Sequence, residues 1–131
     1  MTLQVLVDAL SEAERDIFCA LDTPAAIQAF LDTLAYSAED RYRCPLSVLR
    51  DRTAHCFDGA VFAAAALRRI GHPPLVVNMF PEPNRYDEHL LAVFKQDGHW
   101  GAVGQSNMTG LRLREPVYRS LRELGCCISK P

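Results

Sequence analysis

The sequence lacks the long apolar segments and the one-sided charge that are typical of membrane and nucleic-acid-binding proteins. Its longest late apolar run, Gly59 to Leu67, is too short to span a bilayer, and residues 1–16 lack the basic flank and apolar stretch of a signal peptide. Fourteen basic and sixteen acidic residues give a formal net charge of -2, so no global field would hold a phosphate backbone. We therefore expect no nucleic-acid partner, no membrane association and a cytoplasmic location.

The sequence also lacks the paired cysteines of a disulfide framework. Its five cysteines stand at positions 19, 44, 56, 126 and 127, and only the last two are close together. Adjacent cysteines bridge only with strain, and no CxxC pair or histidine cluster has zinc-site spacing. We expect reduced thiols, no metal site and no cofactor, so that at least one thiol is available for chemistry.

The remaining composition is that of an ordinary globular protein. Hydrophobic residues make up 49% of the chain and charged residues 23%, which leaves too much apolar surface for intrinsic disorder. A chain of 131 residues is long enough to build one core. The sequence predicts a single domain over residues 1–131.

Helix-start signals dominate the first part of the chain, a helical region of residues 1–52. Ser11 and Glu14 have capping-box spacing and predict a helix over 11–21. Thr23 before Pro24 repeats the start signal and predicts a second helix over 24–35. Pro45 then opens a short segment that can form two helical turns.

A third, more apolar helix is predicted from about Ala54 to Arg69. Thr53 can cap it, and Gly71 followed by two prolines ends it. Asp58 is its only charged side chain between Cys56 and Leu67, so little of its circumference can face water. This helix should therefore be buried on several sides.

Three short β-rich runs follow: LVVNMF, HLLAVF and WGAVG. The last two are separated by KQDGH, in which Asp97-Gly98 is a hairpin signal, and together the three runs predict antiparallel strands. Pro116 can begin a final short helix within a C-terminal region of residues 111–131. The elements define an α+β fold with a catalytic-type core over 53–110.

Cys56 is the residue best placed for chemistry, because it falls where the buried helix begins. The first turn of a helix presents unpaired N–H groups and the positive end of the macrodipole, and both favour a thiolate. His89 stands at the head of a predicted strand and could act as its base. Taken alone, a cysteine here is more often an inert core residue. His55 points elsewhere around the helix and is interpreted as structural or exposed.

The order of these elements resembles the transglutaminase-like branch of the papain-like cysteine protease superfamily, in a small bacterial form. The segment TAHCFDGAVFAAAALRRIG matches the cysteine helix of that family. DEHLLAVF and GHWGAVGQSN match its histidine strand and the strand that follows. The resemblance covers roughly residues 45–110 and implies a papain/transglutaminase-like core, in which the cysteine helix packs on a small antiparallel sheet.

The resemblance implies that Cys56 is a nucleophile and His89 a general base, acting on an amide or peptide bond without a cofactor. Backbone N–H groups at the helix start would help to bind the oxyanion. The family usually has an aspartate in the third catalytic position, which orients the histidine, and this sequence has none there. Asn107 or Gln105 can take that role. The expected function is a hydrolase rather than a cross-linking transferase; the alternative is an inactive domain that binds a peptide or protein partner.

Overall fold

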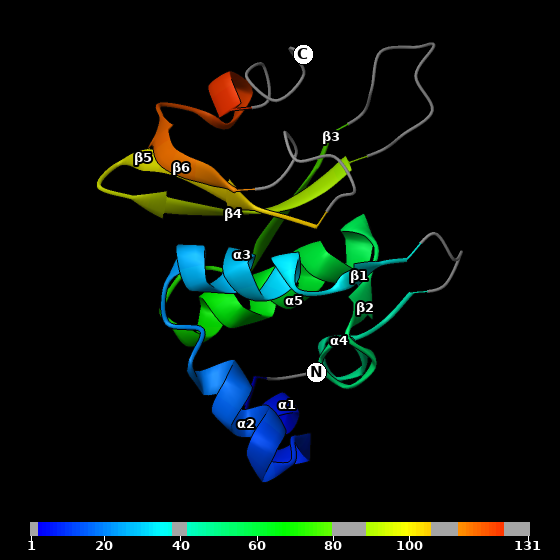
Figure 1. Cartoon of the computed structure of the whole chain (residues 1–131). Helices are drawn as coiled ribbons and strands as arrows, with labels where there is room; N and C mark the ends of the chain where they lie inside the picture. The colour runs from blue at the N-terminus through cyan, green and yellow to red at the C-terminus, as the bar shows by residue number, and fades with distance from the viewer. Residues whose placement is uncertain (1–2, 38–41, 80–88, 106–112, 125–131) are drawn as a thin grey trace.

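The computed structural model describes residues 3–37, 42–79, 89–105 and 113–124, apart from the side chains of Met79 and His89 (Figure 1). Five helices and six strands are assigned in this part of the chain: α1 (Leu3–Ala9), α2 (Glu12–Cys19), α3 (Pro24–Asp32), β1 (Ala35–Tyr36), α4 (Pro45–Asp51), β2 (Thr53–Ala54), α5 (Cys56–Arg69), β3 (Leu75–Met79), β4 (His89–Gln96), β5 (His99–Val103) and β6 (Arg114–Tyr118). The α+β class is confirmed.

The four longer strands form an antiparallel sheet in the order β3-β4-β5-β6, which leaves β3 and β6 at its edges. The predicted hairpin turn joins β4 to β5. Asp97 and Gly98 both have positive φ there, 53° and 80°, as a two-residue turn between twisted strands requires. Three of the four strands are those predicted from the sequence.

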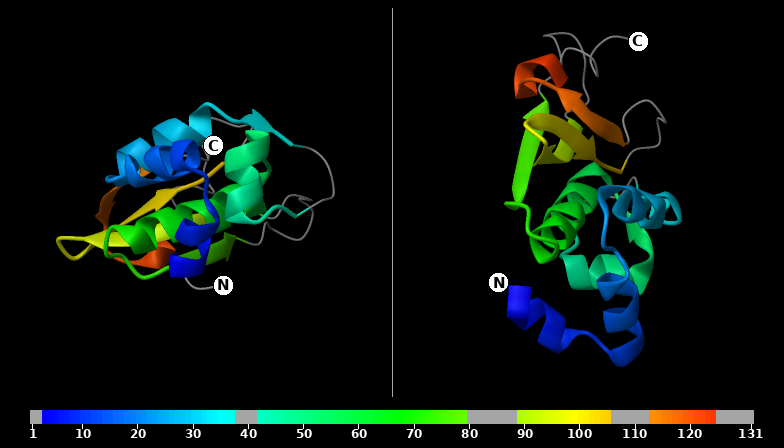
Figure 2. Two further views of the ribbon diagram at one scale, coloured as in Figure 1. Left: turned by 90° about the horizontal axis from the view of Figure 1, so that it is seen from below. Right: turned by 90° about the vertical axis from the view of Figure 1, so that its left-hand side faces the viewer.

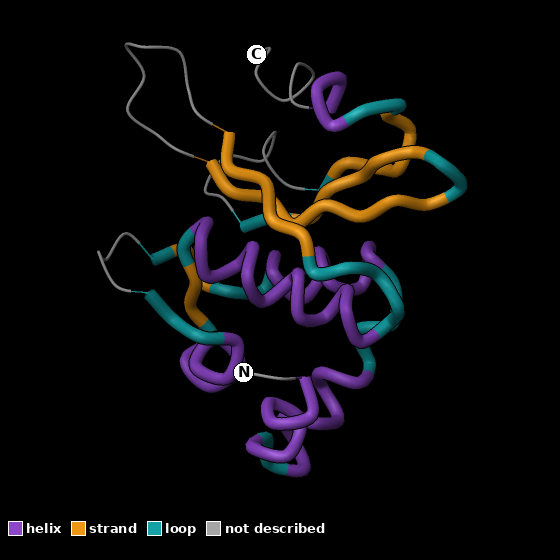
Figure 3. Tube along the Cα trace, turned by 180° about the vertical axis from the view of Figure 1, so that it is seen from behind, coloured by secondary structure: helices purple, strands orange, loops and turns teal. Residues whose placement is uncertain are grey.

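The helix α5 lies against one face of this sheet, with α3 beside it (Figures 1 and 3). Successive side chains of β4 point to opposite faces of the sheet, so this strand contributes to two apolar clusters. Ala92 and Phe94 join the large cluster shared with the helices, whereas Leu91 and Val93 join a smaller one on the other face. The central cysteine-bearing helix on a small sheet is therefore as predicted.

The start signals of the N-terminal helices are confirmed. Ser11 caps α2 with a complete capping box to Glu14, and Thr23 caps α3 by accepting from the backbone N–H of Ala26 at 3.0 Å. The helix α4 begins at Pro45, as predicted. The helix α1 was not predicted; it packs with α4 and α5 at the end of the molecule away from the sheet (Figure 2).

The predicted start of α5 is wrong by two residues. Thr53 does not cap it, because Thr53 and Ala54 pair in parallel with Ala35 and Tyr36 as β2 with β1. Extended backbone over those two residues delays the helix, and His55 becomes its N-cap. The predicted stop is confirmed: Gly71 has φ 100°, and its N–H donates to the carbonyl of Arg68. No described helix is long and apolar enough to cross a membrane.

The predicted helix beginning at Pro116 is also wrong. Residues 114–118 form β6, which pairs with β5, and only residues 121–124 are helical. Pro116 is tolerated because β6 is an edge strand, where a missing backbone N–H need not break the ladder. Leu124 then packs against the outer face of the sheet.

Candidate active site

The imidazole of His55 caps the helix that carries Cys56. Its Nδ1 accepts hydrogen bonds from the backbone N–H groups of Phe57 at 3.1 Å and Asp58 at 3.3 Å. In return a carboxylate oxygen of Asp58 accepts from the backbone N–H of His55 at 3.3 Å. This is a capping box with histidine in the place of serine or threonine. His55 therefore has a structural role, which was one of the two interpretations predicted from the sequence.

The cap changes the expected oxyanion site. Two of the first-turn amides, those of Phe57 and Asp58, donate to the His55 ring rather than pointing at an open site. An acceptor at Nδ1 also requires the ring proton to reside on Nε2, which lies 3.5 Å from Oδ1 of Asp58. An oxyanion at the helix start would therefore have to use other donors or displace this ring.

Cys56 is the first residue of α5, half-buried and not in a disulfide. The residues one, two and three turns further along its side of the helix, Ala60, Ala63 and Leu67, are fully buried. Its side of the helix is thus the core-facing side, while the thiol itself lies at the partly exposed end. The structure thus confirms the predicted position of Cys56 at the start of the buried helix.

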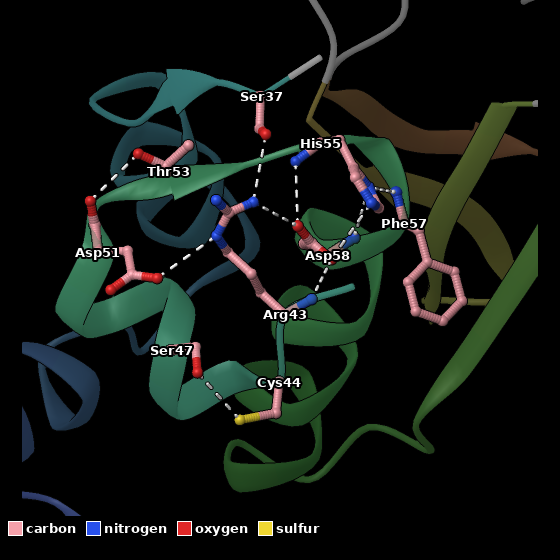
Figure 4. A network of polar contacts seen from close by, with 9 residues as sticks. All are labelled: Ser37, Arg43, Cys44, Ser47, Asp51, Thr53, His55, Phe57 and Asp58. Atoms are coloured by element: carbon pink, nitrogen blue, oxygen red, sulfur yellow. Dashed lines mark hydrogen bonds and ion pairs between the residues drawn. The ribbon is translucent and has the colours of Figure 1, made fainter. Parts of the chain in front are cut away.

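A buried ionic network supports this end of α5 (Figure 4). Asp58 is fully buried, accepts from the backbone N–H of Arg43 at 2.7 Å, and lies 3.6 Å from the Arg43 guanidinium. The same guanidinium donates to Ser37 at 3.2 Å and to Asp51 at 3.4 Å. One aspartate thus ties the helix start to the segment before α4. Sequence reasoning singled out Asp58 but not this role; its place three residues after the N-cap was the available signal.

Three rings form an aromatic cluster beside Cys56, with Tyr42 on its exposed side. The ring of Tyr42 lies 4.8 Å from that of Phe57 and 5.7 Å from that of His55, centroid to centroid. Tyr42 is 72% exposed. The cluster gives the cysteine end of the helix an apolar, solvent-facing side.

Gln105 reaches the same end of the molecule from the sheet. It stands two residues after the end of β5, and a Cβ atom added at Gly59 would collide with the Cβ of Gln105. Because Gly59 lies about one helical turn after Cys56, the end of β5 is seated beside the start of α5. The β4–β5 register, with Ala92 opposite Val103, places Gln105 at the level of the first residues of β4.

The carboxamide of Gln105 is buried and has no hydrogen-bond partner among the described residues. The residue is 1% exposed. A buried, unpaired amide costs about 1–3 kcal/mol, so such groups call for an explanation. Of the two predicted candidates for the third position, Gln105 is the one whose side chain the structure describes.

Gln28 fixes the position of this strand end. Its side-chain amide donates to the carbonyl of Gly104 at 2.9 Å and accepts from the N–H of Gly104 at 3.1 Å, as a neighbouring strand would. Gln28 is buried within α3. Sequence reasoning missed it, because a single glutamine in an apolar helix gives no signal of its partner.

The remaining predicted site residues are only partly described. His89 begins β4, so its backbone lies at the end of the sheet where Gln105 lies, but its side chain is outside the described residues. Asn107 lies outside them altogether. No group of three histidine, cysteine or acidic residues that could hold a metal is found in the described segments.

Cys44 is a second thiol at a helix start. It is exposed, it precedes α4, and its Sγ lies 3.5 Å from the hydroxyl of Ser47. Hydrogen bonds from the Ser47 side chain and backbone lower the pKa of Cys44. Any test of Cys56 must therefore distinguish these two thiols.

Comparison with solved structures identifies the fold. Three structures of Legionella pneumophila LapG match: one is 14% identical and covers 98% of this chain and 94% of its own, with a TM-score of 0.54. The EGTA-treated form is 13% identical, covers 86% and 76%, and gives 0.54. The calcium-bound form is 14% identical, covers 86% and 75%, and gives 0.55. The chain thus has a distant transglutaminase-like fold. No family model and no curated protein sequence matches it.

Proposed function

We propose that the chain is a thiol-dependent acyl-transfer enzyme that hydrolyses an amide or peptide bond. The observation that carries this proposal is the seating of Gln105 against Gly59, one turn from Cys56, in a transglutaminase-like fold. It brings the end of β5 and, through the strand register, the start of β4 to the thiol end of α5. Those are the elements that carry the three proposed catalytic positions.

In the proposed reaction, the Cys56 thiolate attacks the carbonyl carbon of the substrate. The tetrahedral intermediate collapses as His89 gives its proton to the leaving amine, which leaves a thioester on Cys56. His89 then takes a proton from water, and the resulting hydroxide attacks the thioester, which releases the acid and restores the Cys56 thiolate beside a protonated His89. Gln105 is the positioning residue proposed for His89, with Asn107 as the alternative.

Alkylation of individual cysteines tests the nucleophile. We expect iodoacetamide to modify Cys56 at pH 6.5 at least about tenfold faster than the exposed Cys19, because a free thiol is mostly protonated there. The His89→Ala variant should lose this advantage while Cys19 reacts at its original rate. Rates are measured for each cysteine by mass spectrometry, in a Cys44→Ser background. Reaction of Cys56 only after unfolding would refute the enzyme proposal.

The second candidate is an inactive domain of the same fold that binds a peptide or protein. It is favoured by the His55 ring, which occupies two first-turn amides, and by the absence of an aspartate in the third position. The two candidates differ in the reactivity of Cys56 and agree in the need for a peptide-binding surface.

A further inference from the structure

A groove lies against α5, between α1 and β3. It has a volume of about 390 Å³. Val61, Ala65 and Arg68, which recur at helical spacing, form its floor together with the buried Ala64. Leu6 of α1 and Val76 of β3 are among the residues that form its walls, which are almost entirely apolar. Val61, Ala65 and Arg68 thus lie on a different side of α5 from Cys56, which shares the core-facing side with Ala60 and Ala63.

Arg68 is the only charged residue among the described residues that line the groove. No described carboxylate pairs with it. Its neighbour Arg69 differs, because the Arg69 guanidinium donates to the carbonyls of Cys19 at 2.9 Å and Leu21 at 3.1 Å. Arg69 thus holds α5 to the N-terminal helices, whereas Arg68 offers a cation to a ligand in an otherwise apolar groove.

The wall at β3 favours an extended ligand. β3 is an edge strand of the described sheet, with β4 on one side and no described strand on the other. Leu75 and Val76 on this edge are 42% and 39% exposed. An exposed apolar edge readily pairs with another extended segment, whose backbone completes the ladder while alternate side chains enter a neighbouring pocket.

We infer that this groove binds an extended polypeptide segment with alternating apolar side chains and an acidic residue that pairs with Arg68. The inference does not rest on the proposed function, because the groove and Cys56 lie on different sides of α5.

A random hexapeptide library tests the groove without catalysis. The full chain with Cys56→Ser is used, so that bound peptides are not turned over. We expect it to retain peptides enriched in apolar residues at alternate positions, with aspartate or glutamate at one end. Arg68→Gln should weaken the binding of an enriched peptide at least about tenfold, and Arg68→Glu should shift the enrichment from acidic to basic ends. Arg122→Gln, which removes an exposed arginine from the helical residues 121–124, whose Leu124 packs on the outer face of the sheet, should change neither result.

Filling the groove provides an independent test. Ala65→Phe should abolish peptide binding by occupying the floor, and Val76→Lys should weaken it by placing a charge on the wall; thermal unfolding confirms that each variant folds. The inference would be overturned if the Cys56→Ser protein retained no peptide. It would also be overturned if the Ala65→Phe and Arg68→Glu variants retained the same peptides. The outcome is independent of the alkylation of Cys56. Peptide selection by an unreactive protein would refute the enzyme and retain the groove.

Discussion

Gly59 shows how one missing side chain positions the candidate site. In a helix interior, glycine normally destabilises by about 0.8–1 kcal/mol relative to alanine. Here the hydrogen in place of a Cβ lets the strand end at Gln105 lie directly against the helix. The conformational cost of glycine is thus offset by a close approach that no other residue permits.

We predict that Gly59→Ala destabilises the fold by about 1–3 kcal/mol, the opposite of the usual helix effect, because the new Cβ meets the Cβ of Gln105. Urea unfolding measures the free energy. Adding Gln105→Gly should recover most of the loss, since it removes the atom that collides, whereas adding Gln105→Ala should not. Equal recovery by both second substitutions would show that the collision lies elsewhere.

Cys44 provides a pH-dependent prediction. Its pKa is lowered by hydrogen bonds from Ser47, so its thiolate is present at lower pH than that of an ordinary thiol. Removing the hydroxyl in Ser47→Ala should raise this pKa and slow the alkylation of Cys44 near neutral pH. The two rates should converge at high pH, where the thiol is ionised in both proteins. The exposed Cys19 is the internal control, and a slowing that persists at high pH would indicate altered access instead.

The helix α5 depends on an N-cap that is unusual in its chemistry. We predict that His55→Ala costs about 1 kcal/mol of stability, because the N–H groups of Phe57 and Asp58 lose their acceptor. His55→Asn should cost only a few tenths of that, since asparagine is a preferred N-cap and supplies an oxygen in the same place. Urea midpoints compare the three proteins. If the two variants lose the same free energy of unfolding, the contribution of His55 comes from its ring contacts with Tyr42 and Phe57.

Elements defined by local signals were predictable, and those defined by distant partners were not. The capping box at Ser11 and the turn at Asp97-Gly98 are encoded within a few residues, and both were predicted correctly. Thr53 was misassigned because its strand pairs with Ala35, which no local pattern indicates. Pro116 was misassigned because proline opens a helix as readily as it occupies an edge strand.

The site follows the same rule. Cys56 was proposed from its position at a helix start, which is a local property and is confirmed. The clamp between Gln28 and Gly104 and the salt bridge between Arg43 and Asp58 join residues far apart in the chain, so sequence reasoning missed them. These contacts place the candidate catalytic elements, yet no local pattern indicates either pairing.

At the scale of the whole molecule, the Arg43–Asp58 network joins the N-terminal helical part to the helix that carries the cysteine. Asp58 is fully buried, accepts from two backbone N–H groups and lies 3.6 Å from the Arg43 guanidinium. Arg43 retains contacts with Ser37 and Asp51 when that carboxylate is removed. Removing the Asp58 carboxylate therefore leaves two backbone N–H groups without their acceptor, whereas removing the Arg43 side chain leaves those two hydrogen bonds in place.

A double-mutant cycle measures how strongly this network couples the two parts. We predict that Asp58→Asn costs about 3–5 kcal/mol, because it leaves a buried cation poorly compensated and weakens the bonds to two amides. Arg43→Met should cost less, since the amide bonds to Asp58 remain. The double variant should be less destabilised than the sum of the two by about 1–3 kcal/mol in urea unfolding. Additive losses would mean that the charges do not couple, and that the backbone bonds of Asp58 alone hold the segment before α4 to the cysteine helix.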